Sequence, residues 1–265
     1  MRMLWSFNDI RGFGLRATDG EIGEVTDLLF EDATSTVRYL VVETGGWLAS
    51  REVLIAPEAL GEPDGAAARA FPVGLTRAQV KDSPDVGTDR PVSRQREDEL
   101  RAHYGWPPYR NPPAAPVGGG LAGASPNVAY WGRAHGERIA DGIGADQAGG
   151  AVTPTPAAAS DGGDPHLRSA REVVGYRIEA TDGEIGHVED LLIESGSWTV
   201  RYVVVDTRNW WPGKQVPVAP EWMRRVDWSG KRVGVDLTRD MIKSAPGYTS
   251  PADIDRDFEQ RLYRH

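Results

Sequence analysis

Acidic and histidine side chains are the groups in this sequence that could handle protons, and the most regular of them accompany a heptapeptide that occurs twice. ATDGEIG stands at residues 17–23 and again at 180–186. Each copy is followed, four residues on, by an aspartate before a pair of leucines. Carboxyl and imidazole groups act as general acids and bases. The candidate proton-uptake surface that follows from this pattern comprises Glu21, Asp27, Glu184, His187 and Asp190.

A structural role explains the same heptapeptide without any chemistry. Asp19-Gly20 is typical of a type I′ hairpin turn, in which both central residues need positive φ. Ile22 is expected in a core, and Gly23 predicts a bulge or a close approach of two backbones. On this interpretation the motif is mainly scaffold, and its acidic groups have at most a second role at a surface.

Catalytic machinery is not expected. The chain has no cysteine and five histidines, and His187 stands where the first copy has Glu24. A group present in only one copy is unsuited to be shared machinery, so His187 is interpreted as a surface residue, with a proton relay or metal ligation as the alternative. No nucleophile elbow, P-loop, dinucleotide-binding or zinc-protease motif occurs. We therefore predict no enzyme, no metal and no cofactor.

The heptapeptides belong to a longer repeat that predicts two domains. Residues 17–57 align on 180–220 without a gap, and TVRYLVVET recurs as TVRYVVVDT. We place the domains at residues 1–106 and 169–265. Residues 107–168 are rich in Pro, Gly and Ala and predict an extended linker, with an aromatic and arginine-containing island at 127–140.

Each domain is expected to be mainly β with short helices. In the first copy we expect strands at 13–17, 21–31, 36–44, 52–56 and 69–75, followed by a helix capped by Thr76 and a final helix after Ser93. In the second copy Thr238 and Ser250 start the corresponding helices. Short strands at regular spacing indicate an antiparallel barrel or sandwich.

Aromatic and arginine residues are the candidates for partner binding, because these types anchor interfaces. For several of them packing within the chain is the alternative: Trp211 would fold back over the barrel, and the island would rest on its own domains. The candidates are Trp5, Phe7, Trp106, Tyr109, Tyr130, Trp131, Arg133, Arg138, Trp210 and Trp211.

Charge and hydropathy restrict the partners further. The formal net charge is -9, and no cluster of Lys and Arg is present, which argues against nucleic acid. No run of 18 apolar residues occurs, so we expect no transmembrane segment. A cytoplasmic location is the default expectation.

The repeated motifs resemble the PRC-barrel family, named for the cytoplasmic barrel of the photosynthetic reaction-centre H subunit. ATDGEIGEVTDLLFED with VRYLVVET matches the family pattern once, and ATDGEIGHVEDLLIES with VRYVVVDT matches it again. The resemblance implies two small antiparallel PRC-type β-barrels in tandem, each followed by a C-terminal helix and joined by the long linker. The H subunit's usual N-terminal transmembrane helix has no counterpart here, which puts membrane anchoring in doubt.

The resemblance implies a non-enzymatic scaffold or adaptor. Its sharpest form is an H-like accessory subunit that caps the quinone side of a reaction centre, held to the cytoplasmic face of the inner membrane by core subunits. Two alternatives stay open: a ribosome-maturation-type chaperone that binds a ribosomal protein, and a free soluble stress-response protein.

Overall fold

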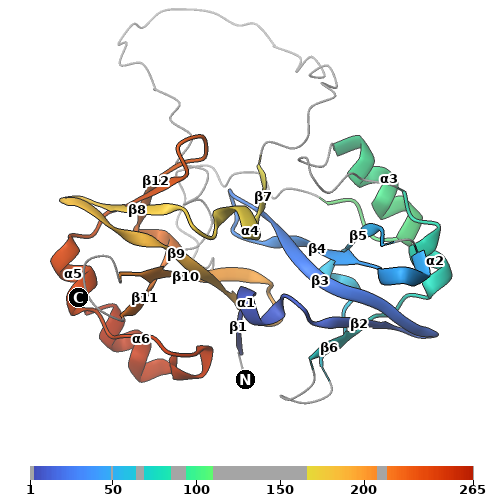
Figure 1. Ribbon diagram of the computed structural model, residues 1–265, viewed down its shortest axis with the longest axis horizontal. Helices are drawn as coiled ribbons and strands as arrows, with labels where there is room; N and C mark the ends of the chain where they lie inside the picture. The colour runs from blue at the N-terminus through green and yellow to red at the C-terminus, as the bar shows by residue number, and fades with distance from the viewer. Residues whose placement is uncertain are drawn as a thin grey trace, which may run out of the picture.

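The chain forms two β-rich halves that lie side by side (Figure 1). The computed structural model describes residues 3–48, 50–63, 69–84, 94–109, 166–207 and 214–264. We call residues 3–109 the first half and residues 166–264 the second half. Residues 110–165 of the expected linker lie outside the described residues. So do six of the partner-binding candidates: Tyr130, Trp131, Arg133, Arg138, Trp210 and Trp211.

The elements follow the same order in both halves, except that the second half contains one more strand before its last strand. The first half contains β1 (Leu4–Ser6), α1 (Phe7–Ile10), β2 (Gly14–Ala17), β3 (Gly20–Glu31), β4 (Val37–Glu43), β5 (Glu52–Ile55), β6 (Ala70–Pro72), α2 (Arg77–Lys81) and α3 (Arg94–Tyr104). The second contains β7 (Leu167–Ser169), α4 (Ala170–Val173), β8 (Arg177–Ala180), β9 (Gly183–Glu194), β10 (Thr199–Asp206), β11 (Gln215–Val218), β12 (Met223–Asp227), β13 (Arg232–Val235), α5 (Arg239–Ser244) and α6 (Arg256–Leu262). The strands expected from the sequence in the first half are thus confirmed, with β7 beginning inside the range assigned to the linker.

The sheets are mixed and open, so the expectation of closed antiparallel barrels is wrong for the described strands. One sheet runs β5-β4-β3-β2-β6 and the other β11-β10-β9-β8-β13-β12. The pairs β2·β6 and β8·β13 are parallel, and the strands at the two ends of each path do not pair with each other. Alternating or continuous apolar residues predict strands, but they do not determine whether the end strands pair.

Each half gives its first strand to the sheet of the other half. Strand β1 pairs with β9, and β7 pairs with β3, both antiparallel. Figure 1 shows β1 and α1 beneath β9, and β7 and α4 beside β3. The turns before β4 and β10 also meet, because the N–H of Val37 donates to the carbonyl oxygen of Trp198 (2.8 Å) and that of Val200 to Ser35 (2.8 Å). We call this junction the seam. It consists of β1 and α1, β7 and α4, and the turns that carry Ser35 and Trp198.

The hairpin turn predicted at Asp19-Gly20 is present between β2 and β3, but it is not type I′. Gly20 has φ +145° and Asp19 does not have positive φ. The Asp19 carboxylate instead accepts the backbone N–H of Arg77 at the start of α2 (2.8 Å). In the second half Asp182 accepts the N–H of Arg239 at the start of α5 in the same way (2.8 Å).

The close backbone approach predicted at Gly23 is confirmed. A Cβ built on Gly23 would lie 1.9 Å from the carbonyl oxygen of Glu43, and one on Gly186 would lie 2.0 Å from that of Asp206. Register shifts in the β2·β3 and β8·β9 ladders lie beside these two glycines. Only glycine fits where these strands cross so closely.

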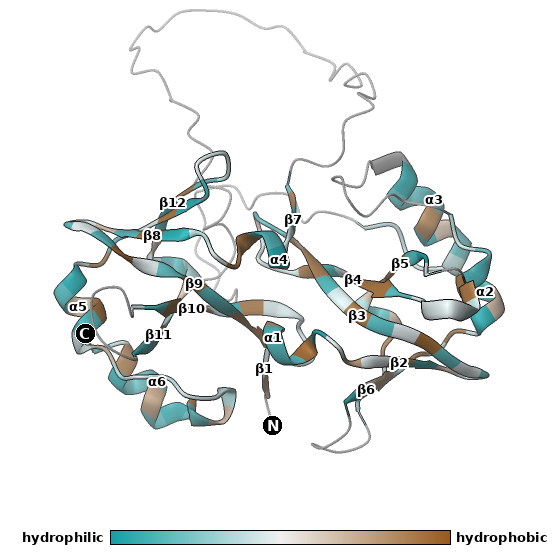
Figure 2. Cartoon of the chain, in the orientation of Figure 1, coloured by the Kyte–Doolittle hydropathy of each residue, from teal (hydrophilic) through white to brown (hydrophobic). Residues whose placement is uncertain are grey.

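The expected helices form and cover the sheets, but Ser250 does not begin the last of them. It precedes a single 3-10 turn at Pro251–Asp253, and α6 begins at Arg256 after its N-cap Asp255. Thr76 and Gln79 make the capping box at α2, and Thr238 caps α5. Strand interiors are apolar, whereas the outer faces of the helices are hydrophilic (Figure 2). Buried Leu100 fixes α3 to the first half, and Phe258 with Leu262 fixes α6 to the second.

Candidate functional site at the seam

Asp27 and Asp190 hold the exchanged strands in place. The Asp190 carboxylate accepts the Ser6 hydroxyl and the backbone N–H of Asn8 (3.1 Å), at the start of α1 in the other half. The Asp27 carboxylate accepts the Ser169 hydroxyl and the N–H of Arg171 (2.9 Å), at the start of α4. Each aspartate therefore secures the N-terminus of the other half's short helix.

Burial dominates the electrostatics of this pair. Asp27 is 4% exposed and Asp190 is 6% exposed. Loss of hydration raises the pKa of both carboxyls above 3.8, against the lowering effect of the serine hydroxyls and backbone N–H groups. The arrangement can bind two short helices, and it places both side chains away from bulk water.

The other groups considered for proton uptake do not converge with these aspartates. Glu21 and Glu184 are exposed on β3 and β9. His187 is half-buried, and its Nε2 lies 3.4 Å from Glu189 Oε2. With buried Asp206, these two residues bring three potential metal-ligating atoms within 4.8 Å of one another. That grouping was not anticipated from the sequence.

A groove of about 1000 Å³ opens at the seam beside β1. Residues from both halves line it, so neither half forms it alone. All of β1, with Met3 before it, lies along the groove, together with Phe13, Leu60 and the turn that carries Trp198. Met3 is 52% exposed, which makes it one of two large apolar side chains so exposed among the described residues.

Aromatic rings form the floor of this groove. The Trp5 ring centroid lies 5.3 Å from that of Phe71 and 5.2 Å from that of Trp198, and Phe13 lies 5.5 Å from Phe71. Trp5 and Phe13 are only partly buried. Edge-to-face and tilted contacts of this kind stabilise the cluster while leaving ring surface accessible.

Two of the three arginines that line the groove are paired with glutamates. Arg38 pairs with Glu97 of α3, and Arg101 pairs with Glu58. The Tyr39 hydroxyl donates to Glu97 (2.7 Å), and burial raises the pKa of Tyr39. These four groups therefore contribute no net charge to the groove.

The corresponding place in the second half is covered. Arg168, Tyr176 and Ser35 stand where the groove has Trp5, Phe13 and Trp198. Trp228, at the tip of the β12–β13 hairpin, lies under the Arg168 guanidinium (4.1 Å to the ring centroid) and 6.1 Å from the Tyr176 ring. The loop that corresponds to this hairpin in the first half, GEPDGAAAR at 61–69, contains no aromatic residue.

The structure places the described partner-binding candidates in three settings. Trp5 lines the groove, whereas Phe7 is 0% exposed in the core of the seam. Trp106 stacks on Tyr104 with centroids 4.4 Å apart. Tyr109 lines the groove, donates its hydroxyl to Glu31 and lies under Arg38 (4.0 Å).

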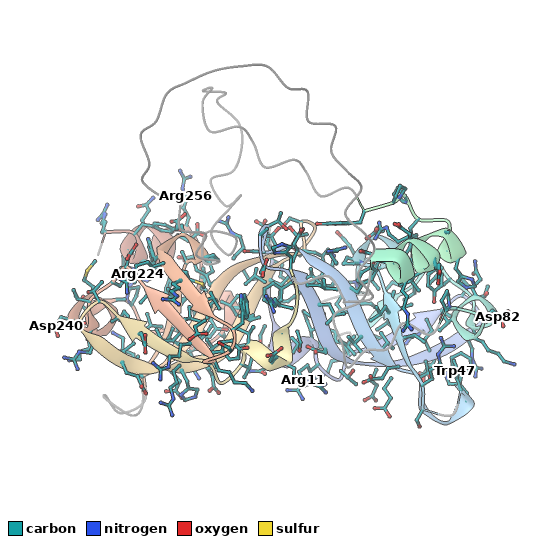
Figure 3. The ribbon with its side chains drawn as sticks, turned by 90° about the horizontal axis from the view of Figure 1, so that it is seen from above. Arg11, Trp47, Asp82, Arg224, Asp240 and Arg256 are labelled. Atoms are coloured by element: carbon teal, nitrogen blue, oxygen red, sulfur yellow. The ribbon has the colours of Figure 1, made fainter. Side chains whose placement is uncertain are left out.

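Trp47, interpreted from the sequence as a packing residue, lies at the end of the first half away from the second (Figure 3). Its indole N–H donates to the carbonyl oxygen of Ile22 (2.6 Å). Local packing is therefore confirmed for this tryptophan.

Sequence reasoning did not identify Ser6, Ser169, Phe13, Phe71 or Trp198. The serines had a detectable signal, because LWS at 4–6 and LRS at 167–169 occupy the same place in the repeat. Phe71 and Trp198 had none, since neither is aromatic in the other copy.

Comparison with known proteins assigns part of the first half to a family. The PRC-barrel domain pattern matches residues 6–60. These residues carry a PRC-barrel domain. The match ends before β6 and does not include the second half of the chain.

An uncharacterized protein of Deinococcus radiodurans is 33% identical over 92 residues. That stretch is 35% of this chain and 32% of the relative, so the chain covers about a third of the relative's length. Among the described residues, no helix is long and apolar enough to cross a membrane.

Proposed function

We propose that the chain is a non-enzymatic scaffold whose two PRC-type units, related by duplication, are locked together to present one composite binding surface to a protein partner. The observation that carries this proposal is the reciprocal strand exchange, with Asp27 and Asp190 each bound to the other half. A pair joined only by a long connection would move independently. Exchange of strands fixes their relative orientation, which is what a surface built from both halves requires.

The sharper form of the proposal is an accessory subunit on the cytoplasmic side of a photosynthetic reaction centre, capping its quinone side without a transmembrane helix of its own. It is supported by the resemblance of both repeats to the H-subunit barrel and by the PRC-barrel match at residues 6–60. Fold likeness alone does not determine function, so the partner must be found directly.

The test uses membranes of the organism that makes this chain. After gentle solubilisation and separation by density, the chain is located by mass spectrometry and compared with bacteriochlorophyll absorbance. Co-migration that survives moderate salt is the expected result. Recovery of the chain only in pigment-free soluble fractions would overturn the reaction-centre assignment, and recovery with ribosomal particles would favour the chaperone alternative.

A further inference from the structure

We infer that His187, Glu189 and Asp206 of the second half bind a divalent transition metal, and that Zn²⁺ is the ion that best fits their ligand atoms. The inference goes beyond the proposed scaffold function and does not depend on it. It rests on where β9 and β10 place the three side chains, on the spacing of the ligand atoms, and on their charge.

The strand register brings the three residues to one face of the sheet. His187 and Glu189 alternate with buried residues on β9, so their side chains lie on the same face of the strand. Asp206 is directly opposite His187 on β10. Gly186 lets the two strands approach closely beside this pair, since a Cβ there would lie 2.0 Å from the carbonyl oxygen of Asp206. Residues of both strands therefore converge at this point.

The spacing of the ligand atoms fits a single ion. One nitrogen or oxygen atom from each side chain lies within 4.8 Å of the other two. His187 Nε2 is 3.4 Å from Glu189 Oε2, whereas an N–H···O hydrogen bond usually measures about 2.7–3.2 Å. Two tetrahedral zinc ligands, each about 2.0–2.1 Å from the ion, are separated by roughly 3.3 Å. This pair is thus spaced as two ligands of one metal, and Asp206 supplies the third ligand from the facing strand.

Charge and atom type select the class of ion. Two carboxylates beside a neutral imidazole carry two negative charges, which a divalent cation balances. Asp206 is 1% exposed, and a cation offsets the cost of burying its carboxylate. An imidazole nitrogen suits zinc and other first-row transition metals, whereas Mg²⁺ and Ca²⁺ prefer oxygen ligands alone. His187 and Glu189 are half-buried, so an ion can enter from solvent and keep a water as its fourth ligand.

The first half carries a different set of side chains at the same positions, namely Glu24, Thr26 and Glu43. Glu24 and Glu43 face each other across β3 and β4. The Thr26 hydroxyl donates to the carbonyl oxygen of Val41 (3.4 Å). Without an imidazole this set is not expected to bind zinc tightly. It also shows that the fold accepts other polar residues here, so the ligands can be substituted without disrupting the sheet.

The test uses the full-length chain, treated with EDTA and then freed of it, at neutral pH. Isothermal titration calorimetry with ZnCl₂ should show one high-affinity site per chain, with a Kd of about 10 µM or lower. CoCl₂ should give the visible absorption bands of four-coordinate Co²⁺, which added Zn²⁺ removes. MgCl₂ and CaCl₂ at about 1 mM should not compete.

Two variants locate the site. His187→Gln and Glu189→Thr should each weaken Zn²⁺ binding by about 100-fold, because loss of a ligand costs at least as much as loss of a group that orients one. Glu189→Thr introduces the residue that the first half has at this position, so we expect an unchanged far-UV circular dichroism spectrum. His103→Gln is the matched control. It removes an exposed histidine of the first half, whose Nε2 lies 2.8 Å from the carbonyl oxygen of Gln79, and should leave binding unchanged.

Three results would overturn the inference: no Zn²⁺ binding below about 1 mM, equal binding by the two ligand variants and the unmodified chain, or an equal loss in His103→Gln. Competition by Mg²⁺ or Ca²⁺ would overturn the choice of a transition metal. Co-migration with pigment is measured independently. If it persists while Zn²⁺ fails to bind, the metal site falls and the scaffold function stands.

Discussion

The two halves share a scaffold and differ in what covers it. In both, a first strand crosses to the other sheet, a serine begins a short helix, and a buried aspartate holds that helix. Beside β7, the β12–β13 hairpin places Trp228 over the junction, whereas beside β1 a groove of about 1000 Å³ opens. The repeated residues maintain the seam, and the residues that differ between the copies determine which junction Trp228 covers and which opens as a groove.

The strongest test of the shared scaffold removes its buried carboxylates. Asp27→Ala and Asp190→Ala should each lower the free energy of unfolding by about 3 kcal/mol, because a buried hydroxyl and backbone N–H groups lose their acceptor. The measurement is urea unfolding followed by far-UV circular dichroism. We expect similar losses for the two variants, and a loss confined to one of them would show that the seam is not symmetric in energy.

The packing of Trp228 over the junction beside β7 can be tested by substitution. Trp228→Ala should cost about 1–2 kcal/mol, because the stacking of Arg168 and the edge contact with Tyr176 are both lost. Arg224→Ala on the same hairpin is the control, since Arg224 is exposed and its ion pair with Asp236 is long at 3.7 Å. Equal stability of the two variants in urea would show that Trp228 does not act as a cover.

A smaller effect concerns pH. The raised pKa values of Asp27 and Asp190 mean that the native state binds more protons than the unfolded chain just above pH 3.8. Their contribution to stability is therefore complete below pH 3.8 and falls as the pH rises through the native pKa. Asp27→Asn and Asp190→Asn should remove this fall, measured as the stability difference from the unmodified chain between about pH 4 and pH 7.

Asp182→Asn is the control, because the pH dependence of stability that it removes has the opposite sign. The backbone N–H of Arg239 lowers the pKa of Asp182, so its contribution is present above pH 3.8 and is lost as the pH falls through the lowered native value. Variants of the buried and exposed aspartates that show the same pH slope would contradict the assigned role of burial.

The smallest expected effect comes from cutting the connection between the halves. With a protease site introduced within residues 111–160, cleavage of the full-length protein should leave the two pieces together in gel filtration, because each sheet contains a strand of the other piece. Unfolding should become dependent on protein concentration. Separation of the pieces under native conditions would mean that the exchanged strands do not hold the halves.

Much of each half could be predicted from sequence, because its signals are local. The Thr76–Gln79 capping box depends on residues within one helical turn, and the close approach at Gly23 is indicated by a glycine inside a strand pattern; both are confirmed. The strand exchange could not be predicted, since β3 and β9 end in nearly the same residues, LLFED and LLIES. A strand beginning LWS therefore matches either sheet, and the sequence cannot say which one it joins.

The groove was missed for a different reason. Trp5 and Tyr109 were candidates because of their residue types, but the groove also depends on Trp198 and Phe13, which lie far from them in the sequence. Trp198 has no aromatic counterpart in the first copy, where Ser35 stands, so the repeat did not indicate that these residues lie together. Closure into a barrel was predicted wrongly because strand propensity does not specify how the end strands pair.

Strand exchange also sets the order in which this protein can mature during its synthesis. The end of β3, at Glu31, cannot pair until the ribosome has added Leu167 of β7, about 136 residues later. At roughly 5–20 residues per second, an unpaired hydrophobic edge is exposed for about 7–27 s. Strand β1 is synthesised first, and it remains unpaired for longer still, until Glu194 of β9 has been added. A nascent chain with open edges is a substrate for chaperones, and its quality control must extend over the entire translation of the message.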